Sequence, residues 1–93
     1  MAIILLCTGA FAQAPHPKDG YVPDEKTAVR IAVAVLSPIY GEEQIIREQP
    51  FHAKLKDGVW IVDGTLPPNM LGGAAEIRID KNTGAILSHM HWK

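Results

Sequence analysis

Apolar positions in the first half of the chain recur with the period of an α-helix. They fill the i, i+3, i+4, i+7 and i+8 positions of one stripe: Ala28, Ile31, Ala32, Val35 and Leu36. This spacing predicts an amphipathic helix from Asp24 to Ser37 whose stripe faces a core. Pro23 and the acidic Asp24 and Glu25 are typical of a helix start. Pro38 is expected to end or kink the helix at Ser37, because it has no amide hydrogen and its ring clashes with the preceding turn.

A second, shorter helix is expected before the pattern changes. Residues 42–49 form a polar stretch with two adjacent isoleucines, and Glu43 and Arg47 stand at i and i+4, where they could pair. The isoleucines would dock this helix onto the core. Pro50 then closes the helical half of the chain.

From Phe51 onward the apolar residues alternate with polar ones, as in half-buried strands. In the first strand, 51–56, we expect Phe51, Ala53 and Leu55 to face inward. An Asp57-Gly58 turn leads into a second strand, 59–62, in which Trp60 is expected to supply much of the core.

The third and fourth strands repeat this hairpin plan. The third strand, 74–79, turns Ile77 and Ile79 inward and Glu76 and Arg78 outward, and a polar loop containing Asn and Gly separates it from the fourth strand, 85–92. The predicted fold class is therefore α+β. One long helix and one short helix pack on a curved antiparallel sheet of about four strands, a reduced cone-like fold.

The first residues differ from the rest of the chain. Residues 2–12 carry no charged side chain and end in the small-x-small pattern Ala10-Phe11-Ala12 that signal peptidases accept. We interpret residues 1–12 as a signal peptide, with cleavage after Ala14 as a second site. The alternative is an apolar first strand retained in the fold. The run is too short for a membrane span, and Leu6 before Cys7 argues against a lipid anchor.

The remaining chain is divided into a flexible lead, 13–20, and a single domain, 21–93. Nine basic and ten acidic residues balance closely, which gives no case for nucleic acid as a partner. Removal of the signal peptide would leave no cysteine, which excludes a disulfide framework and a thiolate site and suits a periplasmic location.

Histidines provide the main candidate chemistry. His89 and His91 lie at i and i+2 of the fourth strand, and His52 could be a third imidazole for zinc, copper or nickel. No carboxylate or thiol is spaced to complete such a site. We therefore expect no metal or other cofactor, with His89 and His91 as weak metal candidates that are better explained as polar sheet surface.

A family resemblance covers residues 20–93. The segments Gly20-Tyr21-Val22-Pro23-Asp24-Glu25-Lys26-Thr27-Ala28, Pro38-Ile39-Tyr40-Gly41-Glu42-Glu43, Lys56-Asp57-Gly58-Val59-Trp60-Ile61-Val62-Asp63-Gly64-Thr65-Leu66-Pro67, Gly72-Gly73 and Ile79-Asp80-Lys81-Asn82-Thr83-Gly84 carry it. Together they resemble the immunity proteins of bacterial polymorphic-toxin systems, described as having a nuclear-transport-factor-2-like fold. The resemblance implies a non-enzymatic inhibitor that binds a cognate toxin.

An inhibitor of this kind needs a surface complementary to its toxin, built from a few anchors and surrounding charge. The predicted partner-binding residues are the outward rows of the first and third strands and one loop tip: His52, Lys54, Lys56, Met70, Leu71, Glu76 and Arg78. If the signal peptide is real, the toxin acts in the periplasm.

Two other functions stay open at this point. The last hairpin, 76–87, is similar to small exported propeptide-like domains that inhibit peptidases or act in envelope signalling. An enzyme pocket, as in larger relatives of the cone fold, is the third alternative. The short chain and the lack of an obvious buried Asp-His pair argue against it.

Overall fold

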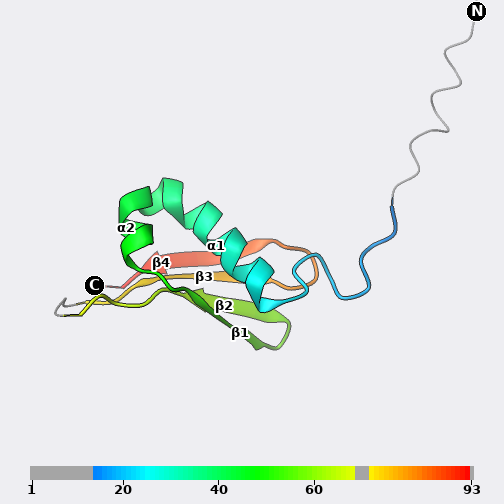
Figure 1. The fold of residues 1–93 in the computed structure, drawn as a ribbon. Helices are drawn as coiled ribbons and strands as arrows, with labels where there is room; N and C mark the ends of the chain where they lie inside the picture. The colour runs from blue at the N-terminus through cyan, green and yellow to red at the C-terminus, as the bar shows by residue number, and fades with distance from the viewer. Residues whose placement is uncertain (1–13, 69–71, 93) are drawn as a thin grey trace, which may run out of the picture.

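The computed structural model describes residues 14–68 and 72–92 of the chain. Two helices lie on one face of a four-stranded antiparallel sheet, as the sequence predicts (Figure 1). The strands lie in the sheet in the order β1-β2-β3-β4, so each strand pairs antiparallel with the strand that follows it in the sequence. The architecture is an α+β fold with a curved sheet. No helix in the described part of the chain is long and apolar enough to cross a membrane.

Helix α1, Glu25–Tyr40, begins as predicted but extends further. The Asp24 side chain caps it by accepting a hydrogen bond from the Thr27 amide at 2.8 Å. Pro38 was predicted to end or kink the helix at Ser37, and the first of these outcomes is wrong, because Pro38 lies inside α1. Near the helix end the missing proline amide costs one internal hydrogen bond, and the amide of Gly41 still closes the last turn on the Ser37 carbonyl at 2.8 Å.

Helix α2, Glu42–Arg47, is two residues shorter than predicted. Arg47 donates to the Gln44 side chain at 2.8 Å, in place of the expected contact with Glu43. Of the two isoleucines, Ile45 is buried and docks the helix, whereas Ile46 is 56% exposed. Half of the docking prediction is therefore confirmed.

The strands are β1 (His52–Lys56), β2 (Val59–Asp63), β3 (Ala75–Asp80) and β4 (Ile86–His91). Asp57 and Gly58 both have positive φ, 49° and 78°, which is the geometry of the predicted two-residue hairpin turn. The β3–β4 loop is held by the Asp80 carboxylate, which accepts from the Asn82 and Thr83 amides at 2.9 Å each. These hydrogen bonds, led by the one from Thr83, lower the pKa of Asp80.

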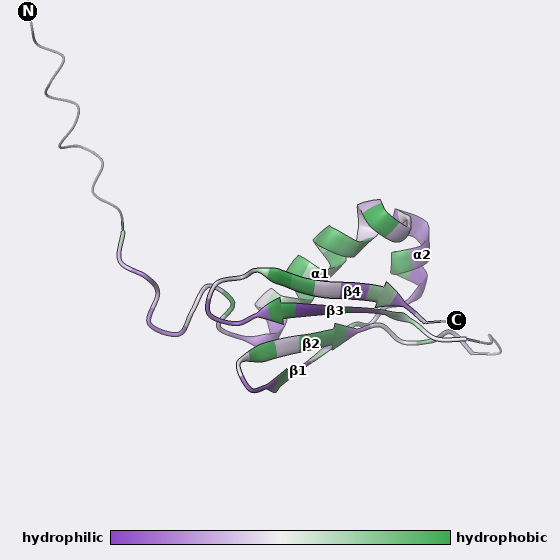
Figure 2. Cartoon of the chain, turned by 180° about the vertical axis from the view of Figure 1, so that it is seen from behind, coloured by the Kyte–Doolittle hydropathy of each residue, from purple (hydrophilic) through white to green (hydrophobic). Residues whose placement is uncertain are grey.

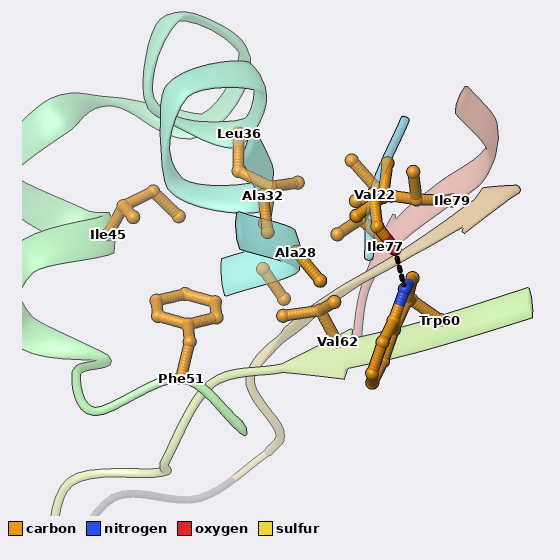
Figure 3. Close-up of a cluster of buried hydrophobic side chains, with 11 residues drawn as sticks. Val22, Ala28, Ala32, Leu36, Ile45, Phe51, Trp60, Val62, Ile77 and Ile79 are labelled. Carbon is orange, nitrogen blue, oxygen red and sulfur yellow. Dashed lines mark hydrogen bonds between the residues drawn. The ribbon is translucent and has the colours of Figure 1, made fainter. Parts of the chain in front are cut away.

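The core lies between α1 and the inner face of the sheet (Figure 3). Its fully or almost fully buried members include the helix residues Ala28, Ala32 and Leu36 and the strand residues Trp60, Val62, Ile77 and Ile79. The Trp60 indole N–H donates to the Val22 carbonyl at 2.8 Å, so the core ring also holds the segment before α1. The predictions for Trp60 and for both β3 isoleucines are confirmed.

The three residues predicted to face inward from the first strand differ in burial. Phe51 is buried and Ala53 is half-buried, but Leu55 is 45% exposed. Leu55 pairs with Trp60 and so points to the helix side of the sheet, yet it lies near the hairpin turn on an edge strand, where it has a neighbouring strand on one side alone.

The segment before α1 is bound to the far hairpin. The amides of Tyr21 and Val22 donate to the carbonyls of Asn82 and Lys81 at 3.1 and 3.0 Å. His16 contacts the Asn82 side chain at 2.8 Å, so contacts with the domain begin inside the stretch predicted to be a flexible lead. The boundaries of that lead and of the signal peptide remain predictions, and residues 1–13 lie outside the described part of the chain.

Candidate functional site

The face of the sheet that points away from the helices gathers the charged residues predicted to bind a partner. Antiparallel register places His52 opposite Asp63 and Asp63 opposite Glu76, and it places Lys54 opposite Ile61 and Ile61 opposite Arg78. Cross-strand partners point to the same face of a sheet. The five predicted strand residues, His52, Lys54, Lys56, Glu76 and Arg78, therefore share one face, which we call the outer face.

The outer face combines an apolar centre with charge on both sides. Val59 and Ile61 of β2 are half-buried between the charged residues of β1 and β3, and Figure 2 shows β2 as a largely apolar strand. Arg78 forms an ion pair with Glu76 at 3.2 Å. Among the described residues, Lys54 and Lys56 have no carboxylate within ion-pair distance, so their charge faces solvent.

The outer face is shallow. A hollow of about 490 Å³ lies between Lys56, Val59, Ile61, Arg78 and Leu87. A second, of about 460 Å³, lies beside it over His52, Lys54 and Asp63. Open, mixed-charge surfaces of this kind suit a protein partner better than a small molecule, which binds in enclosed and mostly apolar pockets.

The loop tip that completes the predicted surface cannot be placed. Met70 and Leu71 lie outside the described residues. Their role as contact residues stays a prediction.

The histidine prediction needs correction. His89 and His91 pair with Ile77 and Ala75, so they point to the helix side of the sheet, whereas His52 is on the outer face. His52 therefore cannot join them. In residues 14–68 and 72–92 no three His, Cys, Asp or Glu side chains are grouped as metal ligands. His89 instead contacts the Tyr40 hydroxyl at 3.1 Å through Nδ1, which ties β4 to the end of α1.

A buried carboxylate that the sequence did not single out lies next to His91. Glu48 follows α2 and its side chain is 1% exposed. Its Oε2 atom contacts His91 Nε2 at 2.7 Å and accepts from the Gln44 side chain at 2.6 Å, while Oε1 accepts from the Ala75 amide at 2.7 Å. We call these four residues, Glu48, Gln44, Ala75 and His91, the Glu48 clamp.

The Glu48 clamp keeps its carboxylate ionised. Burial alone would raise the pKa of Glu48, but the hydrogen bonds from Gln44, Ala75 and His91 outweigh it and hold the pKa below its ordinary value. The other ring nitrogen of His91 contacts the Trp92 carbonyl at 2.9 Å, so both nitrogens are engaged. The clamp joins the end of α2 to β3 and β4.

The sequence carries one weak signal for the Glu48 clamp, which is the histidine pair on β4. Glu48 stands at the end of a predicted helix shortly before Pro50, where a charged residue is ordinarily solvated, so burial could not be inferred from it. The histidine pair on β4 is visible in the sequence, but the carboxylate that contacts His91 comes from 43 residues earlier in the chain. Long-range pairs of this kind can be recognised only once the fold is known.

Comparison with known proteins identifies the family. The chain is 32% identical over 73 residues to "Uncharacterized protein YbbC" of Escherichia coli (strain K12). The match covers 77% of this chain and 60% of that relative, so the chain spans somewhat less than two thirds of the relative's length. No solved structure matches the chain. The sequence profile of the family described as NTF2 fold immunity protein matches residues 27–93, which include most of α1, the whole of α2 and all four strands. The chain therefore belongs to the NTF2 fold immunity protein family.

Proposed function

We propose that this protein binds a cognate bacterial toxin and neutralises it by non-covalent contact, and that the outer face is the contact surface. Membership of an immunity protein family supports the toxin-neutralising role. The family match spans residues 27–93, whereas the resemblance to propeptide-like peptidase inhibitors covers residues 76–87 of the last hairpin. Immunity is therefore the better supported function.

The outer face is the proposed surface because of its charge and its shape. Lys54 and Lys56 stand in one row without an ion-pair partner among the described residues, next to the half-buried Val59 and Ile61. Unpaired charge around an apolar centre speeds association and adds specificity, and the apolar centre supplies area to bury. A toxin surface with acidic residues around an apolar patch would fit this arrangement.

The test uses charge reversal on both sides of the molecule. The binding partner is the toxin whose gene neighbours that of the protein, produced in a catalytically inactive form, and affinity is measured by surface plasmon resonance. The double variant Lys54→Glu/Lys56→Glu should weaken binding by at least about tenfold, chiefly through slower association. Lys26→Glu, an exposed lysine on α1, is the matched control and should change affinity less than about twofold.

Each part of the proposal can fail separately. If the wild-type protein does not bind the toxin, the immunity role toward that toxin is refuted. If it binds and the double variant binds equally well, the contact surface lies elsewhere on the molecule.

We further propose that neutralisation takes place in the periplasm. This rests on the apolar segment 2–12 and its small-x-small ending, which are typical of a signal peptide. Expression of the full chain with a C-terminal tag, followed by cell fractionation and mass spectrometry of the amino terminus, tests it. A periplasmic species that begins at Gln13 supports the proposal, and an uncleaved cytoplasmic species contradicts it.

A further inference from the structure

The two edges of the sheet are unequal. β1 and β4 are the outer strands, and Figure 1 shows them on opposite sides of the sheet. β1 carries Lys54 and Lys56, and its Ala53 amide is capped by the Glu25 carboxylate from α1 at 3.3 Å. Lysines and covering groups are the usual devices that keep an edge strand from pairing with another chain. β1 is therefore a protected edge.

β4 carries neither lysines nor a covering carboxylate, and the register shift in its pairing with β3 lies at its start, between Ile86 and Ser88. Its sequence, Ile86–His91, contains no Lys, Arg, Asp, Glu or Pro. Nine large apolar side chains are exposed among the described residues, and four of them lie in or directly after this strand: Ile86, Leu87, Met90 and Trp92, at 39 to 54% exposure. An edge strand that is both apolar and uncharged is a template for pairing with another strand.

The main chain of β4 is also available. The Trp92 amide donates to the Ala74 carbonyl of the β3 side. Because main-chain groups alternate in direction along an antiparallel strand, those of Met90 and Ser88 also point to β3, whereas those of His89 and His91 point outward. The outward row thus offers donors and acceptors for a fifth strand.

We propose that β4 pairs antiparallel with β4 of a second copy, which makes one continuous sheet across a twofold axis. A twofold strand pair places every β4 side chain opposite another from β4. This strand has no lysine, arginine or carboxylate, and its ionisable side chains are the histidines His89 and His91, so self-pairing brings no permanent like charges together. A twofold axis at Met90 places the two Met90 side chains opposite each other. A toxin is a poorer fit, because recognition by charge would use the lysines of the outer face, which lie across the sheet from this edge.

The proposed dimer goes beyond toxin binding and does not depend on it. It would leave the outer face of β1, β2 and β3 open in both copies. A single strand pair buries little area, so the dimer is expected to be in concentration-dependent exchange with the monomer.

The test measures mass and amide exchange on the full chain without toxin. In sedimentation equilibrium over about two decades of concentration, the average mass should rise toward twice that of one chain. In hydrogen exchange followed by NMR, the amides of His89 and His91 should become more protected as concentration rises. Met90→Lys adds a charge to the edge and should move the association midpoint at least tenfold higher. Ile46→Lys is the matched control on α2 and should leave it unchanged.

Four results would overturn the proposal. One is a single-chain mass at every concentration, and another is a dimer whose midpoint Met90→Lys does not move. The third is exchange of the His89 and His91 amides that is independent of concentration, which would exclude the edge even if the substituted protein did not fold. A mass increase that occurs only when toxin is present would also contradict self-pairing, although it would agree with toxin binding.

Discussion

Removal of the Glu48 carboxylate should destabilise the protein strongly although Glu48 lies outside the apolar core. In the variant Glu48→Ala, the Ala75 amide loses its acceptor at a position where Ala75 is fully buried. A buried donor left without a partner costs about 1–3 kcal/mol. Gln44 and His91 also lose their contacts, but both are partly exposed and can turn to water, so they add less.

The expected loss in the free energy of unfolding is about 2–4 kcal/mol. A domain of this size has a total stability on the order of 4–10 kcal/mol, so the variant should unfold at a much lower denaturant concentration. Urea unfolding at pH 7, followed by the fluorescence of the buried Trp60, measures the change directly. The wild-type and variant slopes must agree for the comparison to hold.

Two further variants separate the causes. Glu43→Ala removes an exposed glutamate from α2 and should change the free energy of unfolding by less than about 0.5 kcal/mol. Glu48→Gln keeps an acceptor for the Ala75 amide while removing the charge next to His91, so its loss should lie between the two. If Glu48→Ala is as stable as Glu43→Ala, the clamp does not hold the fold together and the reasoning is wrong.

The remaining predictions concern pH, the core and one glycine. Folding lowers the pKa of Glu48, so the ionised carboxylate stabilises the fold fully at pH values above the ordinary pKa of glutamate. This stabilisation is lost as the pH falls below about 4. Thermal unfolding from pH 2 to 7 should show the loss, with a flatter profile for Glu48→Gln. Trp60→Ala should cost about 3 kcal/mol or more in urea unfolding, and a loss below about 1 kcal/mol would contradict its central place. Trp60→Phe, which removes the bond to the Val22 carbonyl, should cost less than Trp60→Ala in the same assay. Gly20 has φ 84°, and a Cβ there would stand 2.5 Å from the Lys81 carbonyl oxygen, so Gly20→Ala should lower the melting temperature more than Gly41→Ala, where φ is 100° but the space is open.

The sequence predicted the elements well because each has a strong local signal. The period of 3.6 in α1, the Asp57-Gly58 turn and the alternation of β3 depend on neighbours along the chain, and all three are confirmed. The prediction failed where contacts between distant parts of the chain outweighed a local preference. Pro38 is predicted to end or kink α1 at Ser37, but α1 does not end there. Close to a helix end the cost of a proline is small, and Tyr40 of the last turn gains the contact with His89.

The site was predicted in part for the same reason. Outward positions on β1 and β3 follow from alternation, and the register of both strands with β2 shows that they share one face. Neither the order of strands nor the inward direction of His89 and His91 could be derived from spacing. The Glu48 clamp needed both, because it joins the end of α2 to β3 and β4.

The two faces of the sheet make stability and recognition separable by experiment. Lys54 is exposed and has no ion-pair partner among the described residues, so Lys54→Glu should weaken toxin binding while leaving the unfolding curve of the free protein within about 0.5 kcal/mol of wild type. Glu48→Ala should do the opposite. Even with 1 kcal/mol of stability left, about 85% of the molecules would be folded, so the apparent affinity would fall less than about twofold. If instead Glu48→Ala abolished binding at full folded content, as judged by circular dichroism, recognition would extend to the helix side of the sheet and the outer face could not be the whole contact surface.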